Sequence, residues 1–219
     1  SVVCGYVYTV VLTEDGALYA CGENECGQLG LGHTDKQTTL QKLDGLGSAC
    51  PVTVVCGCDH TVVLMVDGDL YACGCNRCGQ LGLGHISDQT TLQKLDSLGG
   101  AHPTSVACGN WHTVVLMEDG AIYACGGNTL GQLGLGHGND QTTLQKLNVE
   151  CTSRPMSVAC GGYCTVVLME GGAIYACGDN EFGQLGLGHN DGQTTLQKLE
   201  GLGDAHPMKV VCGGSHTVE

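Results

Sequence analysis

The chain has 219 residues, of which 42% are hydrophobic, and 22 acidic against 8 basic residues give it a formal net charge of −14. Its hydrophobic content indicates a folded chain, and no apolar run reaches the roughly 18 residues of a membrane-spanning helix. DNA binding depends largely on Lys and Arg displacing counterions from phosphates, so this acidic balance argues against nucleic acid or an anionic membrane as the partner.

A unit of 52 residues repeats four times without insertion or deletion. Its clearest marker, Gly-Gln-Leu-Gly-Leu-Gly-His, begins at Gly27, Gly79, Gly131 and Gly183. A fixed period of roughly 40–50 residues is typical of a propeller or another stacked array. We therefore expect a single domain over residues 1–219, with repeats at 1–52, 53–104, 105–156 and 157–208 and a partial fifth at 209–219.

The first repeat predicts four short strands. They are expected at Val2–Cys4, Thr9–Thr13, Ala17–Cys21 and Thr39–Leu43. Asp15-Gly16 supplies a tight turn between the second and third, because glycine accepts positive φ. The stretch Gly27–Gly32 is expected to be a loop, and Lys42 suits an exposed blade edge. Since helical periodicity is absent and four strands form one blade, the sequence predicts an all-β propeller of four-stranded blades.

Nine of the sixteen cysteines recur at the repeat period, in apolar, strand-like contexts. One column holds Cys4, Cys56, Cys108, Cys160 and Cys212, and the other holds Cys21, Cys73, Cys125 and Cys177. A free cysteine in such a context behaves as a small hydrophobe, so we interpret both columns as packing residues. This usage predicts an intracellular, reducing compartment, whether cytoplasm, nucleus or organelle. Pairing between the columns depends on geometry, which the sequence does not give.

Two consecutive motifs carry a family resemblance. Val-Val-Cys-Gly-x-x-His-Thr-Val-Val-Leu is followed by Asp-Gly-x-x-Tyr-Ala-Cys-Gly-x-Asn-x-x-Gly-Gln-Leu-Gly-Leu-Gly. Together they resemble the repeat of the regulator of chromosome condensation family, and the resemblance covers the whole chain. It implies a propeller that usually has seven blades. Two positions depart from the family: Cys21 stands where it often has tryptophan, and Leu40 where it often has proline.

The number of blades is left open between two arrangements, a closed four-bladed ring and an excerpt of a seven-bladed one. A closed ring needs no duplicated strand, yet residues 209–219 restart the unit. The chain also begins at Ser1 without an initiator methionine. Both observations favour an excerpt of a longer propeller.

Three motifs that invite a catalytic or cofactor site are better explained by the blade. The glycine loop reads GxxGxG, with neither a helix nor a P-loop lysine after it, which argues against nucleotide binding. The clusters Cys73-Gly-Cys75-Asn-Arg-Cys78 and Cys56-Gly-Cys58-Asp-His60 lack the partner cluster that a tetrahedral zinc site needs. The recurring histidines form no triad spacing. We expect no catalytic residue, cofactor or metal.

Positions that differ between repeats mark a candidate binding surface. They cluster in the loops after the first and third strands, which emerge on the same face of an antiparallel meander. Aromatic residues that do not recur all fall in these loops, and such residues are enriched at interface hot spots. The predicted partner-binding residues are Tyr6, Tyr8, Asp59, His60, Asn110, Trp111, His112 and Tyr163 in the first loops, and Glu23, Glu25, Arg77, Glu181 and Phe182 in the second.

Two functions fit this pattern. One is a non-enzymatic interaction scaffold, or an accessory subunit of a larger assembly, that binds a protein partner through the variable loops. The other is implied by the resemblance: guanine-nucleotide exchange on a small GTPase, an activity of the founding family member, although its exchange elements do not map onto this chain. Ultraviolet sensing within the family relies on clustered tryptophans, whereas Trp111 is the single tryptophan here.

Overall fold

The computed structural model describes residues 1–44, 46, 50–96, 101–149, 153–203, 206–213 and 217–218. Within these ranges every regular element is a β-strand, and the strands form four four-stranded antiparallel sheets and one two-stranded pair. No helix among the described residues could span a membrane. The predicted all-β class is confirmed.

Each sheet is built from four consecutive strands in chain order. The first contains β1 (Val2–Cys4), β2 (Tyr8–Leu12), β3 (Leu18–Gly22) and β4 (Gln37–Lys42). The second contains β5 (Pro51–Cys56), β6 (His60–Met65), β7 (Leu70–Gly74) and β8 (Gln89–Lys94). The third contains β9 (Pro103–Cys108), β10 (His112–Met117), β11 (Ile122–Gly126) and β12 (Gln141–Lys146). The fourth contains β13 (Pro155–Cys160), β14 (Cys164–Met169), β15 (Ile174–Gly178) and β16 (Gln193–Lys198), and the pair is β17 (Val211–Cys212) with β18 (Thr217–Val218).

The four strands predicted in the first repeat are all present, with ends shifted by one or two residues. The largest shift is in β4, which begins at Gln37 because the ladder continues past a bulge in β3 and pairs Gly22 with Gln37. Gly16 has a φ of 82°, as the predicted turn requires. Lys42 is exposed on β4, the outermost strand of its sheet, as predicted.

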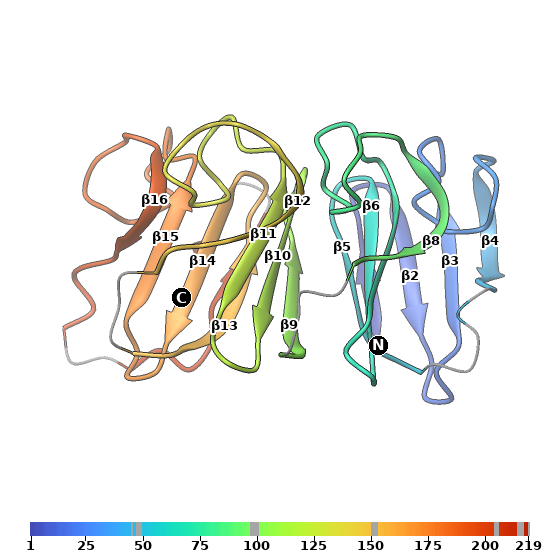
Figure 1. Ribbon diagram of the computed structural model, residues 1–219, viewed down its shortest axis with the longest axis horizontal. Helices are drawn as coiled ribbons and strands as arrows, with labels where there is room; N and C mark the ends of the chain where they lie inside the picture. The colour runs from blue at the N-terminus through green and yellow to red at the C-terminus, as the bar shows by residue number, and fades with distance from the viewer. Residues whose placement is uncertain are drawn as a thin grey trace.

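The four sheets stand side by side as a row of blades (Figure 1). Their first strands contact one another in the order β1, β5, β9, β13 and β17. The sheet β1–β4 lies at one end of the row in Figure 1 and β13–β16 at the other. Of the two arrangements left open by the sequence, the described residues therefore do not form a closed four-bladed ring, because only consecutive blades are in extensive contact.

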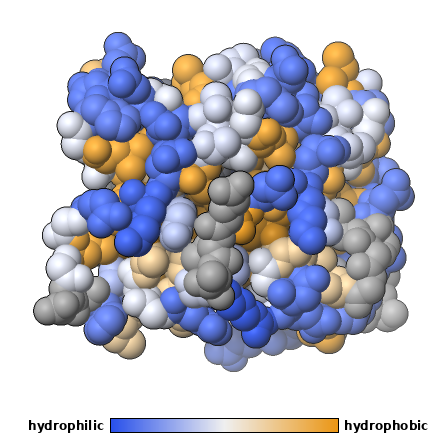
Figure 2. Space-filling model, turned by 60° about the vertical axis from the view of Figure 1, so that its left-hand side comes forward, coloured by the Kyte–Doolittle hydropathy of each residue, from blue (hydrophilic) through white to orange (hydrophobic). Residues whose placement is uncertain are grey.

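The hydrophobic core is divided into layers between neighbouring blades. In the first layer, Val10 and Leu18 of one blade pack with Val63 and Met65 of the next. Because alternate residues of a strand point to opposite faces, the apolar runs of β6, β10 and β14 pack against both neighbours and are buried throughout, whereas β2 is buried on one face. On the side of the molecule where β13–β16 lie, apolar recesses alternate with hydrophilic ridges (Figure 2).

The glycine loop of each repeat binds the fourth strand of the following repeat. Gly32 N donates to Thr90 O at 2.8 Å, and Leu31 bridges to Thr91. Gly27 has a φ of 83°, and a Cβ there would lie 2.5 Å from the Cα of Thr90, so only glycine fits. Equivalent hydrogen bonds from Gly84 and Gly136 join the later blades. The loop is an inter-blade joint, which agrees with its interpretation as architecture.

Candidate protein-binding face

The loops after the first and third strands of each blade lie side by side on one face. Backbone hydrogen bonds connect the two loops of every blade, from Glu23 N to Val7 O, Cys75 N to Asp59 O, Gly127 N to Trp111 O and Asp179 N to Tyr163 O, at 2.7–3.1 Å. We call this surface the loop face: residues 5–7, 57–59, 109–111 and 161–163 with 23–26, 75–78, 127–130 and 179–182. The predicted common position of these loops is confirmed.

Backbone hydrogen bonds also join the loop face from blade to blade. Tyr6 N donates to Cys58 O at 3.2 Å, Cys58 N to Asn110 O at 3.3 Å, and Asn110 N to Gly162 O at 2.9 Å. These loops surround a recess lined by the first cysteine column, Cys4, Cys56, Cys108, Cys160 and Cys212, with the glycines that follow it. The variable side chains are therefore carried by an ordered backbone.

Ten of the thirteen predicted residues reach the surface of this face. Tyr6 and Phe182 expose 80% and 77% of their area and Tyr163 exposes 37%. Glu25, Arg77 and Glu181 are also exposed, and the half-buried members are Glu23, Asp59, Asn110 and Trp111. Exposed aromatic rings on an ordered backbone lose little conformational entropy on binding, which favours a role in recognition.

The other three predicted residues, Tyr8, His60 and His112, are buried and cannot touch a partner in this structure. Each is the first residue of a second strand and points between blades. Tyr8 Oη donates to His60 O at 2.5 Å and accepts from Thr61 Oγ1 at 3.1 Å. The prediction rests on variation between repeats as a sign of exposure, whereas here tyrosine, histidine and, in Cys164 of the fourth blade, cysteine fill one interior position.

The buried histidines join consecutive blades as neutral groups. His60 Nε2 lies 3.1 Å from Thr113 Oγ1, which donates its proton to Gln80 O at 2.8 Å, so the histidine is the donor to the threonine. His112 makes the same contact with Thr165. Burial lowers the pKa of His60 to about 3, with a further contribution from His112, and lowers the pKa of His112 to about 4.

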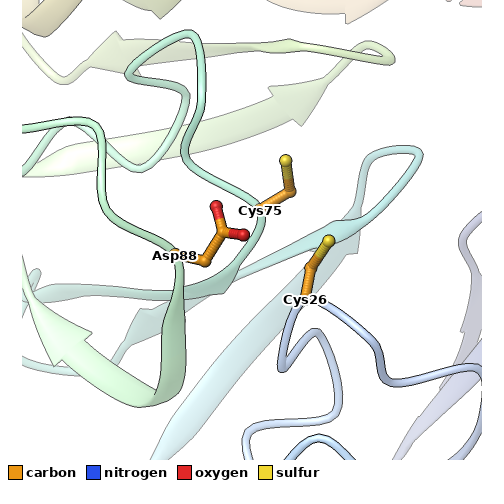
Figure 3. A group of neighbouring side chains, drawn as sticks. All are labelled: Cys26, Cys75 and Asp88. Carbon is orange, nitrogen blue, oxygen red and sulfur yellow. The ribbon is translucent and has the colours of Figure 1, made fainter.

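A cluster of thiol and carboxylate groups lies between the first two blades. One ligand atom from each of Cys26, Cys75 and Asp88 lies within 4.8 Å of the others (Figure 3). Burial, with smaller effects from Cys75 and Asp88, raises the pKa of Cys26 to about 12. The sequence interpretation found no partner for the cysteines around Cys75. The partners exist, but Cys26 comes from the preceding repeat and Asp88 from the far side of the glycine loop.

The fold and this face define the class of the protein: a β-propeller with consecutive four-stranded blades joined by glycine loops. A family model described as the RCC1-like domain matches residues 1–218, and the chain belongs to this family.

Similar proteins differ in what they do. The ultraviolet-B receptor UVR8 of Arabidopsis thaliana is 34% identical over 217 residues, which cover 99% of this chain and 49% of that protein. The secretion-regulating guanine nucleotide exchange factor of Bos taurus is 35% identical over 163 residues, 74% of this chain and 35% of its own length. Among solved structures, Prp20p of Saccharomyces cerevisiae matches with a TM-score of 0.86 at 22% identity, over 98% of this chain and 53% of Prp20p. The chain thus spans 35–53% of the length of these proteins.

Proposed function

We propose that this chain is a non-enzymatic interaction scaffold that binds a protein partner through the loop face. The observation that carries the proposal is the set of exposed aromatic side chains, Tyr6, Tyr163 and Phe182, with half-buried Trp111, in loops whose backbones are hydrogen-bonded together. None of the four aromatics recurs in the other repeats, so the blade itself does not require them. Binding residues commonly lie on loops held by a rigid scaffold.

Charge narrows the chemistry of the partner. The chain carries a net charge of −14, and Glu25 and Glu181 are exposed among the aromatics of the loop face. Complementary charge increases association rates and excludes wrong partners more than it adds affinity. We therefore expect a basic protein surface with apolar pockets for the aromatic rings.

The test is affinity capture with three matched forms of the chain. The first is wild type, the second carries Trp111→Ala with Tyr163→Ala, and the third carries Val66→Ala. Trp111 and Tyr163 lie in adjacent blades, whose loops are joined by the Asn110 N to Gly162 O hydrogen bond. Val66 is 73% exposed in the β6–β7 hairpin, on the opposite face. It is therefore an exposed apolar control outside the proposed site.

Hot-spot residues contribute at least about 2 kcal/mol each, so the double variant should bind a captured partner at least about 30-fold more weakly. Val66→Ala should bind like wild type. Unfolding curves must first establish that both variants fold. Equal affinity of the double variant and wild type would rule out the aromatic contact.

Guanine-nucleotide exchange on a small GTPase is the second candidate, and it rests on the 35% identity to the Bos taurus exchange factor. Prp20p, whose structure was described with its binding to Gsp1p and histones, shares the fold. An exchange factor accelerates release of a fluorescent guanine nucleotide from its GTPase and binds the nucleotide-free form best. Accelerated release from any of a panel of small GTPases would support this function, and a captured partner of another kind would favour the scaffold.

A further inference from the structure

We propose that Cys26, Cys75 and Asp88 bind a Zn²⁺ ion that links the first and second blades. Cys26 lies in the loop after β3 of the first blade, Cys75 directly follows β7 of the second, and Asp88 directly precedes β8. Their ligand atoms lie within 4.8 Å of one another, and in Figure 3 the three side chains converge from separate segments. In a tetrahedral site with Zn–S bonds of about 2.3 Å, ligand atoms are roughly 3.5–4 Å apart, so small side-chain rotations would suffice.

Surrounding hydrogen bonds hold the Asp88 side chain and the backbone of Cys75 in place. Asp88 Oδ1 accepts from Asn76 N at 2.8 Å, and Asp88 Oδ2 lies 3.7 Å from Arg77 Nε. Cys75 is buried, and its N–H donates to Asp59 O at 2.8 Å. Metal-binding carboxylates are commonly oriented by such outer contacts, which fix the ligand before the metal arrives.

The first blade contributes a similarly fixed ligand. Cys26 N donates to Gln28 Oε1 at 3.1 Å, and Gln28 Nε2 donates across the junction to Asp59 Oδ1 at 3.3 Å. The same glutamine therefore holds the Cys26 loop and contacts the second blade. This arrangement brings a thiol of one blade to the thiol and carboxylate of the next.

Comparison between the repeats separates this cluster from the blade architecture. At the next junction the equivalent residues are Cys78, Gly127 and Asp140, and at the third they are Leu130, Asp179 and Gly192. Blades therefore join without a cysteine at either position. At the second junction, which lacks the cysteine pair, Asp140 accepts a hydrogen bond from Asn128 N at 2.7 Å, as Asp88 does from Asn76 N. This contact of the carboxylate therefore belongs to the blade architecture. Of the three junctions, only the first has cysteine at both positions, and it also has the carboxylate.

The donor set selects the ion. Two thiolates with one carboxylate suit borderline-soft Zn²⁺, whereas Mg²⁺ and Ca²⁺ prefer oxygen ligands alone. A disulfide between Cys26 and Cys75 would use both sulfurs and would leave the Asp88 carboxylate only its contacts with Asn76 N and Arg77. Three protein ligands leave a fourth tetrahedral position for water or for the thiol of nearby Cys58, which lies one residue before Asp59.

The experiment uses the whole chain, kept reduced by a phosphine and freed of metal by a chelator. Zn²⁺ is then added, and the zinc content after gel filtration should be one ion per chain. Co²⁺ added in place of Zn²⁺ should give the intense visible bands of tetrahedral coordination and a thiolate charge-transfer band. Cys26→Ser, Cys75→Ser and Asp88→Asn should each weaken Zn²⁺ binding. For the cysteines we expect a loss above about 100-fold, since changes outside the ligand set already cost about 10- to 100-fold.

A matched control comes from the next junction. Asp140→Asn changes the carboxylate equivalent to Asp88 and should leave Zn²⁺ affinity within about 3-fold of wild type. Cys58→Ser identifies the fourth ligand: a loss as large as that of Cys26→Ser assigns it to the thiol, and no loss assigns it to water. Zinc bound equally well by the Cys26, Cys75 and control variants would overturn the site.

A footprint on the wild-type chain keeps the proposal testable if a variant does not fold. Added Zn²⁺ should protect Cys26 and Cys75 from a thiol-alkylating reagent and leave the alkylation rate of exposed Cys50 unchanged, as read by peptide mass spectrometry. Two results would refute the proposal: equal alkylation with and without Zn²⁺, or a Cys26–Cys75 disulfide that forms on removal of the reductant at the same rate whether or not Zn²⁺ is present.

Discussion

At the scale of single residues, the first position of each second strand determines how neighbouring blades are joined. Tyr8, His60, His112 and Cys164 occupy this position in successive blades, and all four are buried. The glycine three residues earlier is required by the same packing: a Cβ on Gly57 would lie 2.1 Å from His60 Cε1 and 2.6 Å from Gly109 O. Recurrence of histidine predicted a role in the blade, but the loop-like neighbours of these residues concealed their burial.

The neutral histidines predict a specific loss of stability in acid. Burial lowers the pKa of His112 from 6.5 to about 4. Between these two pH values the histidine is therefore protonated in the unfolded chain and neutral in the folded chain. This contribution to stability is therefore complete above pH 6.5 and decreases as the pH falls toward 4. One such histidine lowers the free energy of unfolding by about 2 kcal/mol when the pH falls from 7 to 5.

The variant His112→Tyr tests this prediction, because tyrosine already occupies the equivalent position of the first blade, as Tyr8. Urea unfolding at pH 7 and at pH 5 should show a smaller acid-induced loss than in wild type, by about 2 kcal/mol. An unchanged difference between the two pH values would mean that His112 is protonated in the folded state or that it does not titrate on unfolding.

At the scale of elements, the glycine loop depends on one buried asparagine in each blade. Asn128 Nδ2 donates to His137 O at 2.8 Å and to Asn139 O at 3.1 Å, and its Oδ1 accepts from Leu133 N at 2.9 Å. The same pattern holds for Asn24, Asn76 and Asn180. The side chain thereby satisfies backbone groups of a loop that has few backbone partners of its own.

Asn128→Ala should therefore destabilise the fold by about 2–4 kcal/mol, since a buried polar group left without a partner costs about 1–3 kcal/mol. The matched control is Gln145→Ala on the half-buried outer strand β12, where the side-chain amide donates to Thr143 two residues earlier, and it should stay within about 0.5 kcal/mol of wild type. Urea denaturation at pH 7 measures both. Equal midpoints for Asn128→Ala and Gln145→Ala would contradict the role of this asparagine.

The sequence predicted the elements well because their signals are local. Apolar runs, the turn glycine and the repeat place each strand of the first repeat within two residues of its observed ends. Contacts between repeats could not be predicted in this way, because the repeat length does not tell which residues of one blade touch which residues of the next. The convergence of Cys26 with Cys75 and Asp88, and the burial of His60 against Thr113, both arise at blade junctions and became visible only in three dimensions.

At the scale of the whole molecule, each blade buries its apolar faces against its neighbours, and the loops after the first and third strands of every blade emerge on one common face. The repeats could be counted from the sequence, and the restart at residues 209–219 favoured an open arrangement. The curvature of the row could not be predicted, because it depends on the packing of one blade on the next. Repeat proteins of this kind gain stability from such nearest-neighbour interfaces. The reducing compartment expected from the cysteine usage remains a prediction.

The most direct test of the interaction role is hydrogen–deuterium exchange of the chain with and without its captured partner. We expect slower exchange on binding in the loop-face segments 5–7, 109–111, 161–163 and 179–182. Exchange in the hairpin turns of the opposite face, at residues 66–69 and 118–121, should stay unchanged. Protection of those hairpin turns, with the loop face unaffected, would contradict the proposed binding surface.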